Sequence, residues 1–258
     1  MTAPVAVVTG ASRGIGRRLA LDLAEAGHDV ACVARSSRSQ PSKLPGTVDE
    51  TADGVRARGR RAIAFGLDVR DESAIAALAG RVADEWGRCD LLVNNAAVAP
   101  PRPALDDTTK RWRLAVDVNL NGPFYFTYHL RPLLEKSGGR ILNVSSAASV
   151  FPHFGRASYT ATKRALEALT EAMAHDLRER VAVNCLRIDL PVYSEGFEFT
   201  TPGDTSAFED PVIISDAVLW LVRQPLSHTG RIHDVTALRG EGIVRERTPY
   251  RRGSPGSD

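Results

Sequence analysis

The chain has 258 residues, of which 43% are hydrophobic, and it carries 33 Lys and Arg against 31 Asp and Glu. This composition is typical of one soluble domain or two small ones, and it excludes fibrous, collagen-like and disordered classes. The segment 245–258 holds four Arg and two acids, so the rest of the chain is balanced at 29 against 29. This even balance argues against a nucleic-acid-binding face, and the basic segment is expected to be a flexible, solvated tail.

The three cysteines, Cys32, Cys89 and Cys185, occur singly within apolar runs, and no His or Cys spacing suggests zinc. We interpret them as buried thiols of a reducing compartment, and no metal is expected. The first residues, MTAPVAVVTG, lack the charged and apolar regions of a signal peptide. We therefore expect a cytoplasmic protein with no membrane span.

Short β-branched runs alternate with helical patterns along most of the chain. Strands are predicted at 5–10, 29–34, 61–68, 90–96, 140–145, 181–188 and 231–237. Helices are predicted near 14–26, 47–58, 72–86, 106–135, 157–179 and 214–223. This order predicts an α/β fold, a Rossmann-like doubly wound sheet of about seven mainly parallel strands with helices on both faces. No linker divides the chain, so residues 1–258 are expected to form a single domain.

Two irregular stretches interrupt this alternation. The first is a polar loop at 36–46, and the second, at 192–211, mixes aromatic and acidic residues after a central strand. Because ligands of open α/β sheets bind beyond the carboxyl ends of the strands, the second stretch is a candidate substrate lid, extending to about 215. The alternative is a surface excursion with a few packed phenylalanines.

A glycine-rich turn, TGASRGIG, directly follows the first predicted strand and opens a helix. Glycines let the backbone approach a pyrophosphate, and the helix N-terminus supplies free N–H groups and positive potential. A tight strand-to-helix turn without a ligand is the alternative. The residues of this turn expected to bind a dinucleotide are Gly10, Ser12, Arg13, Gly14, Ile15 and Gly16.

The end of the second strand, Ala34-Arg35, indicates which dinucleotide binds. An acid at this place would bind the ribose 2′-hydroxyl of NAD, whereas arginine accommodates the 2′-phosphate of NADP. Arg13 can join Arg35 around that phosphate, so NADP(H) is the expected cofactor. The alternative is that both are surface arginines of an arginine-rich chain.

Tyr159 and Lys163 are four residues apart on a predicted helix, so both project from one face. A phenol normally titrates near pH ~10, and a fixed ammonium beside it is expected to lower its pKa. Only four lysines occur beside 29 arginines, which makes the choice of lysine at 163 informative. Ser146 follows the predicted strand 140–145, and Asn119 lies in a helical stretch weakened by Gly122-Pro123.

The combination resembles the short-chain dehydrogenase/reductase family, in its short single-domain, NADP-preferring branch. The resemblance covers residues 3–237, and its motifs occur in the family's order. They are TGASRGIG (9–16), LDV (67–69), NNAA (94–97), VNLNG (118–122), SS (145–146) and YTATK (159–163).

The resemblance implies an NADP(H)-dependent oxidoreductase that interconverts a ketone or aldehyde and an alcohol. Tyr159 is then the general acid or base, Lys163 binds the nicotinamide ribose, and Ser146 bonds the substrate oxygen. Asn119 holds a water that links Lys163 to solvent. Further cofactor contacts are expected from Asp68 and Val69 at adenine, Asn95 at adenosine, and Ile188 near the nicotinamide.

The segment NCLRIDLPV (184–192) departs from the family, since Ile188 and Asp189 replace its Pro-Gly pair. This departure motivates two alternatives: a non-enzymatic NADP-binding sensor or scaffold, and a reductase of an unsaturated or imine substrate. The small-molecule substrate is expected to be apolar or aromatic, and the resemblance suggests a homodimer or homotetramer built through helices 106–135 and 157–179. The side chains that suggest the apolar pocket are Phe151, His153, Phe154, Tyr193, Phe197 and Phe199.

Overall fold

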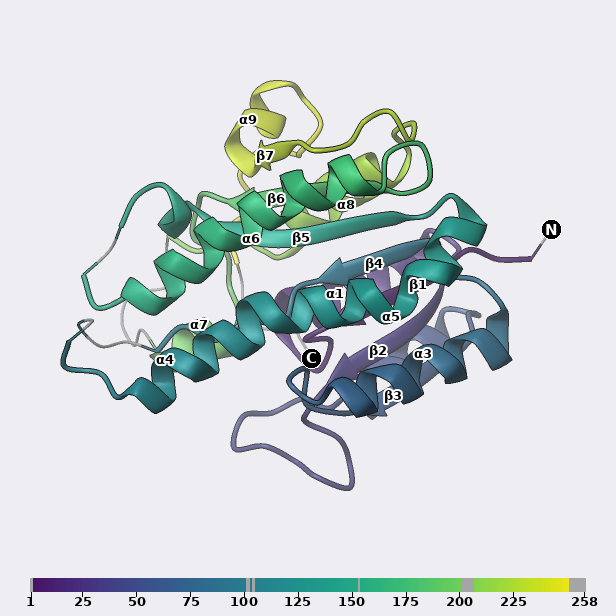
Figure 1. Cartoon of the computed structure of the whole chain (residues 1–258), viewed down its shortest axis with the longest axis horizontal. Coiled ribbons are helices and arrows are strands. Elements are labelled where there is room, and N and C mark those ends of the chain that lie inside the picture. Colours follow the sequence, from purple (N-terminus) through teal and green to yellow (C-terminus); the bar gives the residue numbers. More distant parts are fainter. Residues whose placement is uncertain (1, 101–102, 104, 153, 201–206, 251–258) are drawn as a thin grey trace.

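The computed structural model describes residues 2–100, 103, 105–152, 154–200 and 207–250. Seven parallel strands form one sheet in the order β3-β2-β1-β4-β5-β6-β7. The strands are β1 (Val5–Thr9), β2 (Asp29–Ala34), β3 (Ala62–Gly66), β4 (Leu91–Asn94), β5 (Arg140–Ser146), β6 (Ala182–Ile188) and β7 (Ile232–Asp234). The chain leaves β1 toward one edge and returns at β4 toward the other, which confirms the doubly wound α/β fold (Figure 1).

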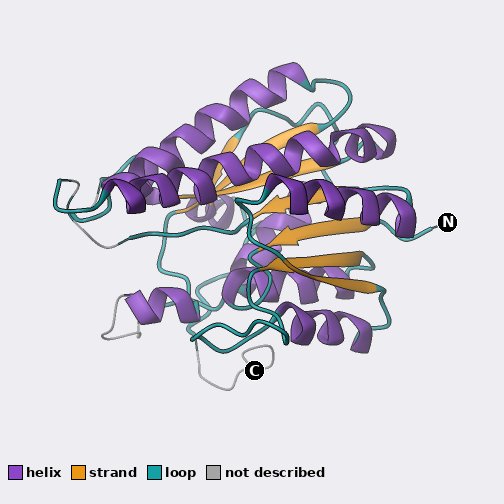
Figure 2. Cartoon of the chain, turned by 60° about the horizontal axis from the view of Figure 1, so that its bottom comes forward, coloured by secondary structure: helices purple, strands orange, loops and turns teal. Residues whose placement is uncertain are grey.

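Helices cover both faces of the sheet (Figure 2). One layer contains α1 (Gly14–Glu25), α2 (Val48–Ala57) and α8 (Val212–Val222). The other contains α3 (Glu72–Trp86), α5 (Gly122–Ser137) and α6 (Ala157–Asp176). Successive side chains of a strand point to opposite faces, so Ala6 and Val8 pack against the first layer and Val5 and Val7 against the second. Burial on both faces explains why the strands are apolar throughout.

The helix predicted at 106–135 is interrupted. It consists of α4 (Thr109–Val116), a π-helical turn (Asp117–Asn121) and α5. The wide turn carries Asn119, whose side chain is fully buried and hydrogen-bonded outside its own helix. Polar side chains that bond elsewhere favour departures from regular helix, as the sequence had suggested for this stretch.

The last predicted strand, 231–237, is shorter than expected. β7 ends at Asp234, and α9 (Val235–Gly240) begins immediately after it. The backbone N–H and the hydroxyl of Thr236 both donate to the carboxylate of Asp189, at the end of β6. This long-range bond stabilises the first turn of α9 and overrides the strand-like sequence.

The stretch between β6 and α8 contains the short helix α7 (Glu195–Thr200). Backbone hydrogen bonds join the two ends of this stretch. Tyr193 N–H donates to Glu209 O at 2.9 Å, and Glu209 N–H donates to Pro191 O at 2.9 Å. We call residues 192–200 and 207–210 the lid. The expectation of a lid reaching 215 is modified, because α8 starts at Val212 and residues 201–206 lie outside the described ranges.

The C-terminal segment, residues 244–250, packs against the lid. Asp210 N–H donates to Thr248 O at 2.8 Å, and Tyr250 N–H donates to Phe208 O at 3.0 Å. The ring of Tyr250 stacks on Tyr193 with centroids 3.5 Å apart. Of the tail expected at 245–258, residues 245–250 are thus bonded to neighbouring parts of the chain, although 245–247 and 249 are exposed, and the remainder lies outside the described residues. Charge composition alone could not reveal these partners.

Among the described residues, none of the helices has the length and apolar character required to cross a bilayer.

Candidate active site

The predicted site residues gather at the edge of the sheet where the parallel strands end. Thr9 closes β1, Asn94 closes β4, Ser146 closes β5 and Ile188 closes β6. Ser146 and Ile188 are direct register partners on neighbouring strands. The glycine turn and the residues Ser146, Tyr159 and Lys163 thus border the same edge, where ligands of open α/β sheets bind.

The glycine turn has a backbone shape that requires glycine. Gly10 and Gly14 have φ values of +70° and +53°, in the left-handed region that favours glycine. A Cβ on Gly16 would lie 2.2 Å from the carbonyl oxygen of Gly10, so no side chain fits there. The side-chain amide of Asn95 donates to Thr9 O at 2.8 Å and holds β4 against this turn. The turn therefore has the form of a cradle for a phosphate group, and the residues present fit a dinucleotide.

Charged side chains collect at the adenosine end predicted from the sequence. Arg13 donates to Ser42 Oγ at 2.7 Å and to Gly46 O at 3.0 Å, so the polar loop 36–46 fixes its orientation. Burial lowers the pKa of Arg13. The negative charge of Glu195 opposes this shift, and the positive charge of Arg35 adds to it. Arg35 is exposed directly after β2 and shares the surroundings of Arg13.

Asp68 follows β3 and faces the same end of the sheet. Its carboxylate accepts two hydrogen bonds from Arg70, at 3.0 and 2.7 Å, and Arg70 is the main cause of its lowered pKa. Arg35 contributes to the same shift. Val69 is buried, and its carbonyl lies 3.1 Å from the position of a Cβ on Gly122. The structure therefore brings Arg13, Arg35 and Asp68 to one region, with Val69 packed against the start of α5.

Ser146, Tyr159 and Lys163 come together from β5 and α6. Tyr159 and Lys163 lie one turn apart on α6, and a side-chain hydrogen bond links Tyr159 to Ser146. Lys163 is only 2% exposed. Its Nζ donates to Val144 O at 2.6 Å and lies 5.6 Å from the centroid of the Tyr159 ring. Helical spacing predicted the juxtaposition, whereas the backbone acceptor on β5 was not predicted.

The protonation states differ from the sequence-based expectation. Burial raises the pKa of Tyr159, against smaller opposing effects of the Ser146 hydrogen bond and the charge of Arg156. Burial also lowers the pKa of Lys163 to about 8. The expected lowering of the phenol pKa is therefore not seen, because the effect of burial outweighs the opposing contributions of Ser146 and Arg156. The phenol is protonated at neutral pH.

Asn119 lies within the π-helical turn, and its side chain bonds to Val98 and Thr162. Its Oδ1 accepts from Val98 N–H at 2.8 Å, and its Nδ2 donates to Val98 O at 2.9 Å and Thr162 Oγ1 at 3.0 Å. Both amide hydrogens are thereby used. Its Oδ1 accepts the one bond from Val98 N–H and keeps a second acceptor position, and Thr162 is a supporting residue that the sequence analysis missed.

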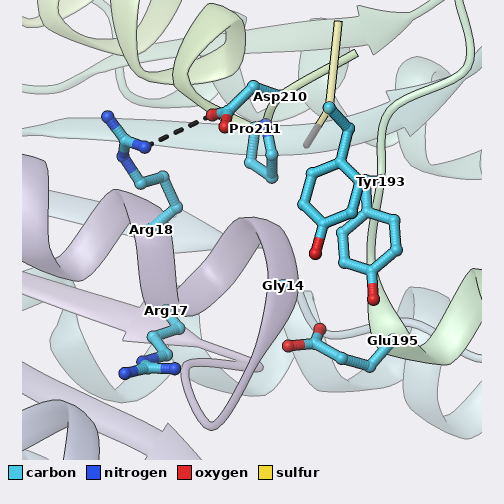
Figure 3. Close-up of a pocket in the computed structure, with 8 residues that line it drawn as sticks. Gly14, Arg17, Arg18, Tyr193, Glu195, Asp210 and Pro211 are labelled. Carbon is cyan, nitrogen blue, oxygen red and sulfur yellow. Dashed lines mark hydrogen bonds and ion pairs between the residues drawn. The ribbon is translucent and has the colours of Figure 1, made fainter. Parts of the chain in front are cut away.

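The lid lies directly over the glycine turn (Figure 3). A Cβ on Gly14 would be 2.7 Å from Cβ of Ser194, so the lid backbone packs against the turn itself. Tyr193 and Glu195 line one side of a pocket whose opposite side is formed by Arg17 and Arg18 of α1. Asp189, which replaces the glycine of the family after β6, accepts from Thr236 N–H at the start of α9.

The apolar residues predicted to line a substrate pocket are distributed unevenly. Phe151 and Phe154, in the loop after Ser146, are 69% and 91% exposed, and Phe197 and Phe199 of α7 are also exposed. Tyr193 is buried and donates to Glu198 at 2.8 Å. His153 lies outside the described residues. Within the described ranges, no group of three or more His, Cys, Asp or Glu side chains could hold a metal ion.

The sequence pattern of the short chain dehydrogenase family matches residues 4–189. The chain belongs to this family.

Similar proteins agree with this assignment. Human hydroxysteroid dehydrogenase-like protein 2 is 33% identical over 241 residues, which cover 92% of this chain and 57% of the relative. The chain therefore spans somewhat over half the length of this relative. A short chain dehydrogenase from Mycobacterium paratuberculosis bound to NAD has a TM-score of 0.79 at 28% identity, covering 90% of this chain and 95% of that one.

A second solved structure has a similar relation. Carveol dehydrogenase from Mycobacterium avium in complex with NAD has a TM-score of 0.81 at 25% identity, covering 91% of this chain and 98% of that one. The short-chain dehydrogenase fold thus extends over nearly the whole of both chains.

Proposed function

We propose that residues 1–258 form one catalytic domain that reduces a ketone or aldehyde to an alcohol with NADPH, or catalyses the reverse reaction. The observation that carries this proposal is the convergence of Ser146, Tyr159 and Lys163 beside a glycine turn. The cofactor, when bound, supplies the hydride, and the protein orients the substrate and manages the proton.

Tyr159 is proposed as the proton donor to the carbonyl oxygen. Its raised pKa keeps the phenol protonated, which suits carbonyl reduction. Ser146 donates a hydrogen bond to the same oxygen and stabilises the charge that develops there. Lys163 holds the nicotinamide ribose and provides a positive charge near the phenol. Lys163 then returns a proton toward the phenolate of Tyr159, and a water relay at Asn119 replaces the proton of Lys163 from solvent.

The cofactor is held, in this proposal, along the edge from β2 to β6. Gly10, Ser12, Gly14, Ile15 and Gly16 surround the pyrophosphate. The adenosine and nicotinamide ends are assigned to Asp68, Val69, Asn95 and Ile188.

The preference for NADP over NAD rests on Arg13 and Arg35. β2 ends at Ala34 without an acid, and Arg13 is held near Arg35 by Ser42 and Gly46. Two guanidinium groups suit a dianionic 2′-phosphate. The related solved structures contain NAD, so this chain differs from them in its proposed cofactor.

The substrate is proposed to be apolar or aromatic. The exposed rings of Phe151, Phe154, Phe197 and Phe199 come from two separate segments that follow β5 and β6. Exposed Trp112 of α4 and the stacked pair Phe124 and Tyr128 of α5 support a homo-oligomer formed through these helices.

The testing experiment measures oxidation of NADPH and NADH across a panel of apolar ketones and aldehydes. We expect Tyr159→Phe to abolish turnover while cofactor affinity changes less than about twofold. A charge-assisted hydrogen bond contributes about 1.5–3 kcal/mol, so Arg35→Ala should reduce NADPH affinity about tenfold or more and leave NADH affinity unchanged.

Arg38→Ala is the matched control, because Arg38 lies on the same loop and pairs with Asp53. Retained turnover in Tyr159→Phe would overturn the proposed mechanism. Tight NADPH binding by the unmodified protein with no turnover on any carbonyl would favour a sensor.

A further inference from the structure

A buried carboxylate, Glu167, lies one helical turn after Lys163 on α6. The residue is only 1% exposed. Its Oε1 accepts hydrogen bonds from Ser145 Oγ at 2.7 Å, Ser149 Oγ at 2.6 Å and Arg187 Nε at 2.9 Å. Its Oε2 accepts from Arg187 Nη2 at 2.9 Å. Such complete pairing is what makes a buried charge tolerable.

The two serines bonded to Glu167 lie on either side of Ser146. Ser145 is the preceding residue on β5, and Ser149 ends the 3₁₀ turn (Ala147–Ser149) that follows. Both hydroxyls donate to the same carboxylate oxygen, so that oxygen fixes the backbone before and after Ser146. The 3₁₀ turn is additionally capped by Ser146 Oγ, which accepts from Ala148 N–H at 3.3 Å.

Arg187 extends the cluster across the sheet. It is the register partner of Ser145 on β6, and it also pairs with Asp234 of β7 at 3.0 Å. Arg164 of α6 approaches Glu167 at 3.5 Å. Burial raises the pKa of Glu167, but the hydrogen bonds from Arg187, Ser149 and Ser145 outweigh it and lower the pKa overall. Glu167 is therefore ionised at neutral pH.

The charged and titratable groups that act on Lys163 are few. Burial disfavours its ammonium, while Cys185 of β6 and Glu167 favour it. The pKa of the Cys185 thiol is raised by burial to about 12, so the thiol is neutral at physiological pH. The Tyr159 phenol, whose ring lies 5.6 Å from Nζ, is also neutral. Of these groups Glu167 is the ionised one, and it lies one turn from Lys163 on α6.

We propose that Glu167 is a positioning residue of the active site: its carboxylate fixes the strand end and turn that carry Ser146, and its charge stabilises the Lys163 ammonium. The inference rests on the proposed function, because Ser146 and Lys163 are assigned there. Glu167, together with Ser145, Ser149 and Arg187, acts on the reaction through Ser146 and Lys163 and does not itself touch the substrate.

The test follows the titration of Lys163 by NMR of lysine-labelled protein. The chain has only four lysines, so the spectrum is simple, and Lys163→Arg identifies the relevant signal. Glu167→Gln keeps the shape of the side chain and removes its charge. Glu171→Gln, an exposed position one turn further along α6, is the matched control.

We expect the Lys163 midpoint to fall by about one pH unit in Glu167→Gln and to stay unchanged in Glu171→Gln, because a nearby opposite charge shifts a pKa by about 1–3 units. The kcat of Glu167→Gln should fall about tenfold, and its loss with rising pH should begin at lower pH than in the unmodified enzyme. Ser149→Ala should lower kcat several-fold without moving the Lys163 midpoint.

The inference is overturned if Glu167→Gln leaves both the midpoint and kcat within the range of Glu171→Gln. If Glu167→Gln does not fold, Glu167→Asp replaces it, because aspartate keeps the charge but has a shorter side chain. Its kcat should fall while the Lys163 midpoint stays the same. An unchanged kcat would overturn the positioning role. The NMR midpoint requires no turnover. An inactive unmodified protein with the expected shift would therefore contradict the proposed function while supporting the action of Glu167 on Lys163.

Discussion

Two regions meet at the candidate active site, and they are held in opposite ways. The β5–α6–β6 unit is joined by backbone register over seven residue pairs and by the buried cluster around Glu167. The lid is held from distant parts of the chain: the carboxylate of Glu209 accepts two hydrogen bonds from Arg239 and one from Thr248 N–H.

The difference indicates a division between a rigid part and an adjustable part. Ser146, Tyr159 and Lys163 lie on the unit in which the buried Glu167 is bonded by residues of β5, β6 and the turn after β5. Ser194 and Glu195, next to the glycine turn, lie on the lid, whose anchors come from α9 and the C-terminal segment. Substitutions in the first region should therefore lower the free energy of unfolding, and changes that release the lid should weaken cofactor binding.

The largest effect should come from Arg187→Met, which breaks the rigid region. It leaves the Glu167 carboxylate buried with only its serine partners and the exposed Arg164. Removing one partner of a buried ion pair typically costs about 3–5 kcal/mol, so the free energy of unfolding in urea should fall by about that amount. Arg178→Met, at an exposed position, should change it by less than about 0.5 kcal/mol. A loss below about 1 kcal/mol for Arg187→Met would contradict the distinction.

A moderate effect is expected from deleting residues 245–258. This removes the Tyr250 stack on Tyr193 and the Arg245–Asp216 ion pair, contacts that contribute about 0.5–1.5 and 0.2–1 kcal/mol respectively. The unfolding free energy should fall by about 1–2 kcal/mol, whereas NADPH affinity, measured by fluorescence titration, should weaken about tenfold. Deleting only 251–258 provides the control. Equal cofactor affinity of the two truncated proteins would show that the C-terminal segment does not hold the lid.

The smallest effect should arise outside both regions, at His228 and His233. Their Nε2 atoms are 2.9 Å apart, and burial is the largest cause that lowers both pKa values, that of His233 to about 4. A lowered histidine pKa means that the folded protein favours the neutral form. The contribution of the pair to the free energy of unfolding is therefore present above pH ~6.5 and is lost as the pH falls toward 4. At this half-buried site the loss should be of the order of 1 kcal/mol after solvent screening.

His233→Phe should flatten that pH dependence in thermal unfolding curves recorded between pH 4 and 7. The exposed His175→Phe serves as the comparison. If the two variants show the same pH profile, the histidine pair does not contribute.

The sequence predicted most of the rigid region and little of the adjustable one. Short apolar runs located the seven strands, and the spacing of Tyr159 and Lys163 predicted that they share a helix face. The partners of buried polar groups were not predictable, because Val144 O and Arg187 come from strands far along the chain. The same reason applies to two further contacts. Asp189 accepts from Thr236 N–H, and a helix forms there instead of the predicted strand. Asp216 pairs with Arg245, a residue that the composition had placed in a solvated tail.

The π-helical turn at Asp117–Asn121 has a consequence for insertions and deletions. Hydrogen bonds of a π-helix span five residues instead of four, so this wide turn accommodates one residue more than an α-helical turn between α4 and α5. Deleting one residue there would let the turn close as an α-helix and keep the buried Phe126, Leu130 and Leu134 on the sheet. It would, however, move Asn119 away from Val98 and Thr162, so the extra residue serves the placement of that one side chain.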